Sequence, residues 1–336
     1  MLPQASSSTI AAIRRFFQLA VSISLLLMRA LSAPVPVGTV RAQGVESRPQ
    51  PTPQESLLYR DARTLIDWTP DQIHAVPELR KLHPAESQQE LHAILREVGE
   101  RVARFFGDFP NTTCTEEVRS GPCPLGGDRC AVTFQEKFRY LVLSHGQDGS
   151  GLMTEYRTDM KGRPVDYQNL PNVRILTYGF ATAPLEHFNP PNLTASRFRY
   201  FGRQTVDGRE TDVVGFAEIP GEYGGPAEFG LKNHEVALLV QGLAWIDRTT
   251  YDILRIRTWL LAPRPDVGLE ALVTLVEYAA VRLPEISTTF RLPATVIVTT
   301  VMVDVLHDRH QFRNVHRYSD YKLFRVESRI SPVQEK

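Results

Sequence analysis

A chain of 336 residues with 42% hydrophobic and 23% charged side chains can bury a sizeable core, in one large domain or two smaller ones. Lysine plus arginine and aspartate plus glutamate both number 38, so the formal net charge is zero. Without a basic excess the chain lacks the electrostatic footprint of a nucleic-acid binder, and we expect no nucleic-acid partner.

The first 33 residues have the layout of an export signal. Arg14 and Arg15 precede an apolar run over 16–28, and small residues ending at Ala33 form a cleavage site. The run is shorter than the roughly 20 residues of a membrane span, so we expect no stable span once the signal is removed. A later cut after Ala42, a retained N-terminal anchor and a twin-arginine route are alternatives. We expect an exported protein, in the periplasm or outside the cell.

Residues 43–52 form a polar, proline-rich linker, and residues 53–108 a helical leader. Helix starts are predicted where a threonine precedes Pro53 and Pro70, and where Ser87 and Glu90 form a capping box. Apolar residues behind the last start recur at helical spacing, which predicts an amphipathic helix packed on a sheet. This stripe consists of Leu91, Ile94, Leu95, Val98, Val102, Phe105 and Phe106.

The three cysteines, Cys114, Cys123 and Cys130, lie in a short stretch rich in glycine and proline. In an oxidising compartment two of them would form a disulfide and one would be left over, but the sequence does not say which. A zinc site would need a fourth ligand and closer spacing.

From about residue 131 the hydrophobic period changes from that of a helix to that of a strand, and turn residues recur regularly. We expect an antiparallel β domain over 109–330 and a tail over 331–336. Asp207-Gly208 predicts a tight hairpin. The segment 269–281 fits either a strand or a helix. The alternating, more polar segment 312–330 is predicted to be an outer strand.

Two predicted strands, 236–246 and 295–306, are apolar on both faces. Such a strand must be covered twice, by a helix on one side and by loops, a second sheet or a ligand on the other. A further strand is expected after the turn that follows the first of these two. On it, Ile253 should share the largely polar, solvent-facing side with Arg255 and Arg257. The candidate ligand-cavity residues are Leu243, Trp245, Val298 and Met302; the alternative is that they are ordinary core beneath the leader helices.

One predicted strand ends in Gly-x-x-Trp-Ile-Asp-x-x-Thr, an extended segment follows it, and a hairpin is predicted at 202–216. In these features the chain resembles the LolA/LolB and RseB-like periplasmic proteins over roughly 131–330. The resemblance implies an α+β fold in which N-terminal helices pack on a large, curved antiparallel sheet, an incomplete barrel around a hydrophobic cavity. The longer leader and the cysteine stretch depart from that family, and the chain also resembles an exported bacterial family without an assigned activity. The matching residues are Gly242, Trp245, Ile246, Asp247, Thr250, Ile253, Arg255 and Ile256.

Residues that could carry chemistry are few. His307 and His310 are weak metal candidates because they lie three residues apart, yet their segment, which runs on to His316, has the pattern of a polar loop. Glu116 and its neighbour Glu117 read as surface carboxylates. Ser144 and His145 would point to opposite faces of a strand, so they do not form a nucleophile and base. We expect no enzyme and no cofactor.

These patterns favour a non-catalytic binding protein whose curved sheet holds a hydrophobic or amphiphilic ligand, a lipid or a lipoprotein acyl chain. An envelope scaffold with a filled core, which docks a protein partner on its leader, is the alternative. A hydrolase without a known motif is the third hypothesis.

Overall fold

The computed structural model describes residues 53–60, 62–144, 153–165, 183–222, 228–231 and 234–324. The predicted export signal, the linker and the tail lie outside these ranges. The described residues all belong to the second of two compact units, Val45–Lys336. Within them no helix is long and apolar enough to cross a membrane.

The leader is a series of short helical segments followed by one long helix. α3 begins with the predicted capping pattern, because the Thr69 hydroxyl accepts from the Gln72 amide and the Gln72 side chain accepts from the Thr69 amide. The box predicted before the long helix is absent, because the helix begins at Leu91 with Glu90 as its N-cap, and the Ser87 hydroxyl accepts from the Gln89 amide instead. The segments are α2 (Pro53–Arg60), η1 (Leu65–Asp67), α3 (Pro70–His74), η2 (Pro77–Leu79) and α4 (Leu91–Asp108).

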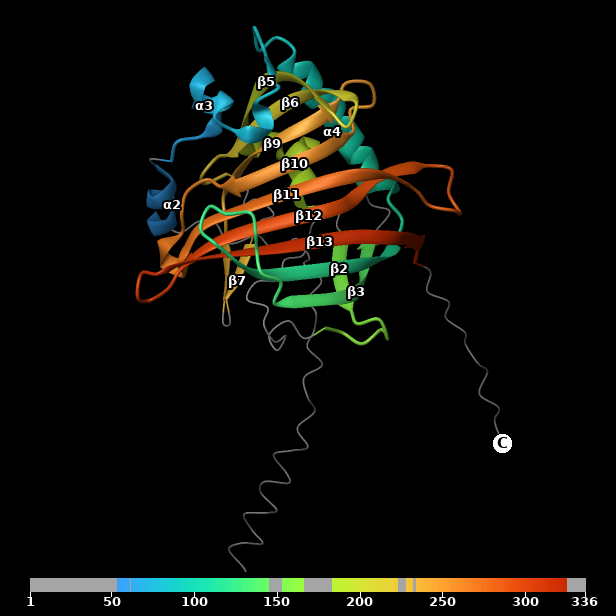
Figure 1. Cartoon of the computed structure of the whole chain (residues 1–336). Coiled ribbons are helices and arrows are strands. Elements are labelled where there is room, and N and C mark those ends of the chain that lie inside the picture. The colour runs from blue at the N-terminus through green and yellow to red at the C-terminus, as the bar shows by residue number, and fades with distance from the viewer. Residues whose placement is uncertain are drawn as a thin grey trace, which may run out of the picture. The chain divides into compact units, whose positions relative to one another are not determined.

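One antiparallel sheet of eleven strands dominates the described residues, in the order β1-β5-β6-β9-β10-β11-β12-β13-β2-β3-β4 (Figure 1). It is curved and does not close, so the expected α+β fold is confirmed. Its strands are β1 (His83–Pro84), β2 (Thr112–Cys123), β3 (Phe134–Ser144), β4 (Met153–Thr158), β5 (Ser196–Val206), β6 (Arg209–Glu218), β9 (Val240–Asp247), β10 (Ile253–Leu260), β11 (Leu269–Arg282), β12 (Thr289–Val303) and β13 (Arg309–Leu323); β7 (Glu228–Leu231) and β8 (His234–Ala237) pair separately. The connections include the 3₁₀ turns η4 (Ala183–Phe188), η5 (Pro190–Ala195) and η6 (Pro265–Val267).

Local turn chemistry explains the tightest hairpin. Asp207 and Gly208 have φ values of 50° and 76°, as a two-residue turn between β5 and β6 requires. Gly202 in β5 has φ 134°, and a Cβ there would lie 2.0 Å from the His83 carbonyl oxygen, so only glycine lets β1 pair at this point.

The order of strands differs from the sequence expectation at one end of the sheet. β13 is not an outer strand, because β2 pairs along its free side. β2 itself was not foreseen as a strand, since its buried positions include the polar residues Thr112, Glu116 and Ser120 and show no hydrophobic alternation. The ambiguous segment 269–281 is a strand, β11, and the apolar run 236–246 is divided between β8 and β9.

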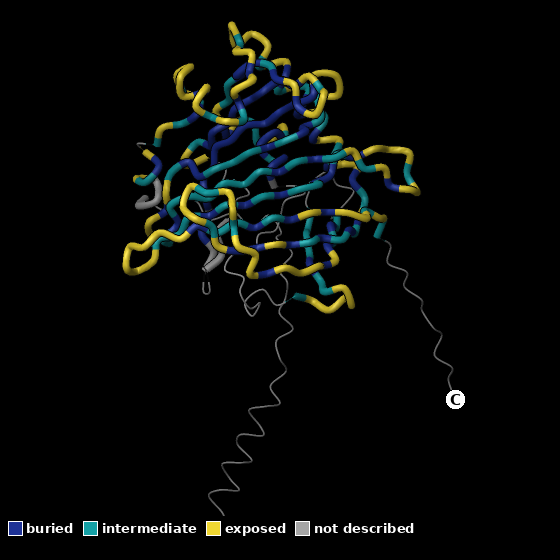
Figure 2. Tube along the Cα trace, viewed as in Figure 1, coloured by how far each residue is buried: buried dark blue, intermediate teal, exposed yellow. Residues whose placement is uncertain are grey.

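The two faces of the sheet are covered by different parts of the chain. We call the face against α4 the inner face and the opposite one the outer face; Figure 2 shows how burial varies along the strands. The α4 side chains Ile94, Val98 and Phe106 pack on the inner face, and each such buried side chain contributes about 1.5–3 kcal/mol. The inner face includes Val214, Ala244, Ile256, Val276 and Val296; the outer face, beneath η1, α3 and η2, includes Val213, Leu243 and Trp245.

A β-bulge in β10 corrects the expected facing of one residue. Ile253 is opposite Ile246, but Arg255 is already opposite Trp245, so Leu254 is an extra residue. The bulge places Ile253 in the inner-face core, while Arg255 remains on the outer face. Strict alternation had assigned both residues to one face.

Candidate functional site

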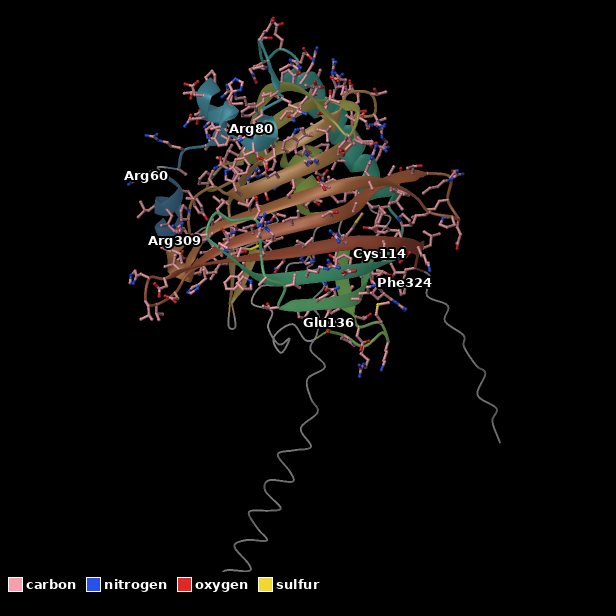
Figure 3. All side chains as sticks on the ribbon, in the orientation of Figure 1. Arg60, Arg80, Cys114, Glu136, Arg309 and Phe324 are labelled. Carbon is pink, nitrogen blue, oxygen red and sulfur yellow. A yellow bond between two sulfur atoms is a disulfide. The ribbon has the colours of Figure 1, made fainter. Side chains whose placement is uncertain are left out.

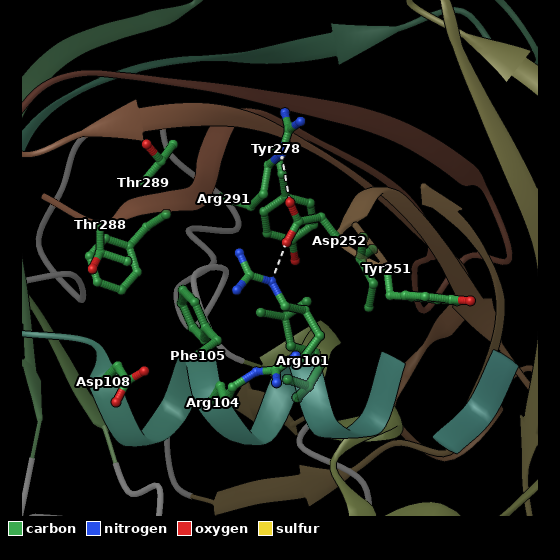
Figure 4. A pocket seen from close by; sticks show the side chains of 14 residues that line it. Arg101, Arg104, Phe105, Asp108, Tyr251, Asp252, Tyr278, Thr288, Thr289 and Arg291 are labelled. Atoms are coloured by element: carbon green, nitrogen blue, oxygen red, sulfur yellow. Dashed lines mark hydrogen bonds and ion pairs between the residues drawn. The ribbon is translucent and has the colours of Figure 1, made fainter. Parts of the chain in front are cut away.

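A pocket lies between the C-terminal half of α4, the β9–β10 turn and the facing ends of β11 and β12 (Figure 4). We call it the α4 pocket. Its apolar walls come from Val102, Phe105, Leu185, Ile253 and Phe290. A water-sized molecule can enter about 40 Å³ of it, room for a few waters or for one end of a larger molecule.

Aromatic rings make one wall of this pocket and attach α4 to the sheet. Phe105 of α4 meets Phe290 of β12 edge to face, with 6.4 Å between ring centroids. Phe109, just after the helix, stacks on Phe105 at 5.0 Å and meets Phe290 at 5.5 Å. Contacts of this kind contribute about 0.5–1.5 kcal/mol each beyond their buried area.

Charged groups surround the mouth of the α4 pocket. Asp252 of the β9–β10 turn lies between two of them: its Oδ1 is 2.5 Å from Arg101 Nε, and its Oδ2 is 3.6 Å from Arg291 Nε. The Asp252 side chain is only 12% exposed. The carboxylate therefore links α4 to the turn and to β12.

Tyr278 of β11 brings an unpaired polar group to the pocket. Its side chain lines the pocket, the residue is 6% exposed, and its hydroxyl has no hydrogen-bond partner among the residues that the structure describes. Burial raises the pKa of this phenol, so it stays a neutral donor. An unpaired buried hydroxyl costs about 1–3 kcal/mol, and a ligand oxygen at this point would remove that cost.

A second hollow, the outer groove, lies between the leader and strands β10 and β11 on the outer face. It has about 370 Å³ that a water-sized molecule can enter, within the size range of small-molecule sites. Trp68 stacks on Trp259 there, with centroids 5.7 Å apart and planes 15° apart. Arg257 lies over Trp259 and pairs with Glu78 of the leader.

A buried polar cluster occupies the inner face where β13, β2, β3 and β4 lie side by side. The Glu116 carboxylate accepts hydrogen bonds from Arg157 and His316, and from the Tyr318 hydroxyl at 2.9 Å. Glu116, Arg157 and His316 have fully buried side chains, and the Arg157 guanidinium lies over the Tyr140 ring. This corrects the view of Glu116 as a surface carboxylate and of His316 as part of a polar loop.

The four residues proposed from the sequence to line a cavity lie in three places. Leu243 and Trp245 are fully buried on the outer face beneath the leader. Val298 is in the inner-face core, and Met302 is partly buried beside Leu269. Alternation within β9 and within β12 was right, but which faces of the two strands lie on the same side of the sheet depends on their pairing. A ligand-lining role for these residues stays a prediction.

The weak metal candidates are exposed. His307 is in the β12–β13 turn with φ 66°, and His310 Nε2 lies 2.9 Å from Asp304 Oδ2. Among the residues that the structure describes, no group of three or more His, Cys, Asp and Glu could hold a metal ion.

Among the cysteines, Cys123 and Cys130 form a disulfide. Cys114, labelled in Figure 3, is a buried free thiol on β2. The disulfide thus joins the second and third cysteines of the glycine- and proline-rich stretch, and the remaining cysteine, Cys114, belongs to the sheet.

The residues of the α4 pocket were not singled out from the sequence. Arg101 and Phe105 read as ordinary positions of an amphipathic helix, and Tyr278 lay in a segment of ambiguous type. Asp252 and Arg291 come from different hairpins, and no local pattern connects them. The pairing of β10, β11 and β12 and the packing of α4 on the sheet bring the five side chains together.

Comparison with known proteins finds likeness in fold alone. No family model matches the chain, and no curated protein matches it in sequence. A DUF1329 family protein from Desulfovibrio piger aligns with a TM-score of 0.37 at 11% identity, over 69% of this chain and 92% of that one. A domain assigned to outer membrane lipoprotein sorting from Vibrio parahaemolyticus aligns with a TM-score of 0.30 at 12% identity, over 67% and 92%. Likenesses at these TM-scores carry no conclusion about family, ligand or activity.

Proposed function

We propose that this chain is an exported, non-catalytic binding protein that holds a hydrophobic or amphiphilic ligand between α4 and the inner face of the sheet. The observation that carries the proposal is Tyr278, which lines a pocket with apolar walls and a charged mouth under α4 and whose buried hydroxyl has no hydrogen-bond partner among the described residues. Small-molecule sites combine apolar walls with a few convergent polar groups.

The cover over the inner face supports a site that can enlarge. α4 contributes one apolar stripe to the core, and its C-terminal half is attached at the pocket by the phenylalanine contacts and by Asp252. Moving this half of α4 aside would expose apolar strand residues that a ligand chain could cover, regaining roughly 25 cal/mol per Å². In this proposal the α4 pocket is the closed form of the site.

The compartment is supported by two independent features. The N-terminal sequence has the layout of an export signal. The Cys123–Cys130 disulfide is the kind of bond that persists in oxidising compartments such as the periplasm.

Binding of a hydrophobic fluorescent dye, with competition by 1-decanol, tests the proposal. Thr289→Trp places a ring at the mouth of the α4 pocket from an exposed position, and Val273→Trp places the same ring in the outer groove as a matched control. We expect saturable, decanol-displaceable binding that Thr289→Trp weakens by about tenfold or more, a loss of about 1.4 kcal/mol, and that Val273→Trp leaves unchanged. The reverse pattern would move the site to the outer groove, and no displaceable binding by the wild type would refute the proposal.

The outer face favours a second candidate, the envelope scaffold. The outer groove continues into apolar side chains that no core cluster covers, and such patches often contact a partner. A photo-crosslinking residue at position 273 in the native host would then give one discrete protein adduct, and the same residue at 289 would not. The apolar set is Val273, Leu275, Ile297, Val301 and Val315, all partly buried.

A further inference from the structure

We propose that the α4 pocket selects amphiphiles with a carboxylate head group, such as a medium-chain fatty acid, over uncharged amphiphiles of the same length. This inference rests on the proposed function and concerns which ligand the same site prefers. It follows from the charges at the pocket mouth, from their hydrogen-bonding capacity and from the geometry of the walls.

The mouth has more positive charge than its own acidic groups neutralise. Arg101, Arg104 and Arg291 line it together with Asp108 and Asp252, which leaves one positive charge in excess. Within the described part of the chain, Arg104 has no acidic partner, and Asp252 is the only one of Arg101 and Arg291. A monoanion would balance this charge.

Within the described residues, the guanidiniums of Arg101 and Arg291 retain unused donors. Asp252 binds Arg101 closely, but at 3.6 Å its second oxygen is too far from Arg291 Nε for a hydrogen bond. Arg291 is 20% exposed and Arg101 34%, so both are partly shielded from water. A guanidinium presents five N–H groups in a planar fork that suits a carboxylate, and charge-assisted bonds strengthen where water is partly excluded.

The walls behind these charges are apolar, as an amphiphile requires. Phe105, Phe290, Val102 and Leu185 line the same pocket as the arginines. In Figure 4 the Arg101 side chain rises from α4 toward Asp252, and Phe105 extends from the same helix into the pocket. The space of about 40 Å³ accepts a head group and its first carbons before α4 moves. Tyr278 would donate to an acid or an alcohol alike, so the arginines supply the selectivity.

Calorimetric titration of the folded, mature chain with decanoate, 1-decanol and decyl phosphate tests this inference. We expect decanoate to bind about tenfold tighter than decanol, as charge-assisted bonds to arginine imply. Arg291→Gln should remove most of this preference by weakening decanoate alone. Arg104→Gln, at an exposed and unpaired position, should reduce it less and cannot disturb the core. Arg309→Gln is the matched control, because this arginine pairs with Glu270 away from the pocket.

The outcomes separate the two proposals. Equal affinity for decanoate and decanol would overturn the head-group inference and leave the proposed function standing. Binding of neither ligand would overturn the proposed function itself. Tighter binding of decyl phosphate than of decanoate would show that the site prefers a dianion and would overturn the carboxylate assignment, and so would a decanoate preference that survives in both pocket variants.

Discussion

His316 Nδ1 lies 2.8 Å from Glu116 Oε1, and both side chains are fully buried on the inner face of the sheet. Burial tends to raise the pKa of Glu116, but the Arg157 charge and hydrogen bonds from His316 and Arg157 outweigh it and lower the pKa to about 2. Burial, aided by the Arg157 charge, lowers the pKa of His316, and the neighbouring Glu116 opposes this shift only in part. The folded protein therefore holds an ionised carboxylate beside a neutral imidazole.

The first prediction concerns stability against acid. The unfolded His316 takes up a proton near its ordinary pKa of 6.5 and the folded one does not, so the free energy of unfolding should fall as the pH drops below 6.5. Glu116 adds a second loss between its ordinary pKa of 4.5 and its folded value of about 2. Each extra proton that the unfolded state binds changes the free energy of unfolding by up to about 1.4 kcal/mol per pH unit. Urea unfolding over a pH series measures how the free energy of unfolding depends on pH.

His316→Gln is the informative variant for this pH dependence, because it should remove the loss that begins at 6.5 and keep the loss that begins at 4.5. His92→Gln, at an exposed position of α4, serves as control for the substitution and should retain both losses. Identical profiles for the wild type and His316→Gln would contradict the assignment.

The second prediction concerns the tryptophan of the β9 strand end. Trp245 is fully buried beneath Leu65 and Leu79, and its Nε1 donates to Gln204 Oε1 at 3.3 Å. Trp245→Ala should lower the free energy of unfolding by about 3–5 kcal/mol. Trp259→Ala, at a partly buried ring, should cost less. A loss below that of Trp259→Ala in urea denaturation would argue against a core role for Trp245.

The third prediction uses the unpaired hydroxyl of Tyr278. Removing a buried polar group that has no partner should stabilise the free protein, so Tyr278→Phe is expected to raise the free energy of unfolding by about 1 kcal/mol. If a ligand oxygen accepts from this hydroxyl, the same variant binds decanol and decanoate less tightly. Thermal melts and titration together give the two readouts. A variant that is destabilised and binds normally would show that the hydroxyl has a structural partner instead.

The fourth prediction concerns thiol reactivity. Cys114 is buried and burial raises the pKa of its thiol, with the charge of Glu116 acting in the same direction, so little reactive thiolate forms. We expect iodoacetamide to label no cysteine of the native protein and only Cys114 after unfolding without reductant. Cys123 and Cys130 should become reactive only after reduction, because they form a disulfide. Mass spectrometry of the labelled peptides distinguishes these sites, and labelling of native Cys114 would show that β2 opens readily.

Much of the fold could be predicted because it depends on short-range pattern. Asp207-Gly208 specifies its turn by backbone conformation, and the stripe from Leu91 to Phe106 specifies the buried face of α4 by helical spacing. The candidate site could not be predicted in this way. Arg101, Asp252 and Arg291 are far apart in the sequence, and none belongs to a local motif.

The sequence by itself determined the antiparallel class, the tight β5–β6 hairpin and the amphipathic helix, since the hydrophobic period and the turn residues act over a few neighbouring residues. The tertiary structure alone decided that β2 pairs with β13, that Leu254 is a bulge and that Trp245 and Val298 face opposite ways. These features depend on the register between strands, which is set by long-range hydrogen bonding and by burial of one face. A polar strand such as β2 cannot be recognised from local pattern, because its buried Glu116 is stabilised by Arg157 and His316, which come from distant strands.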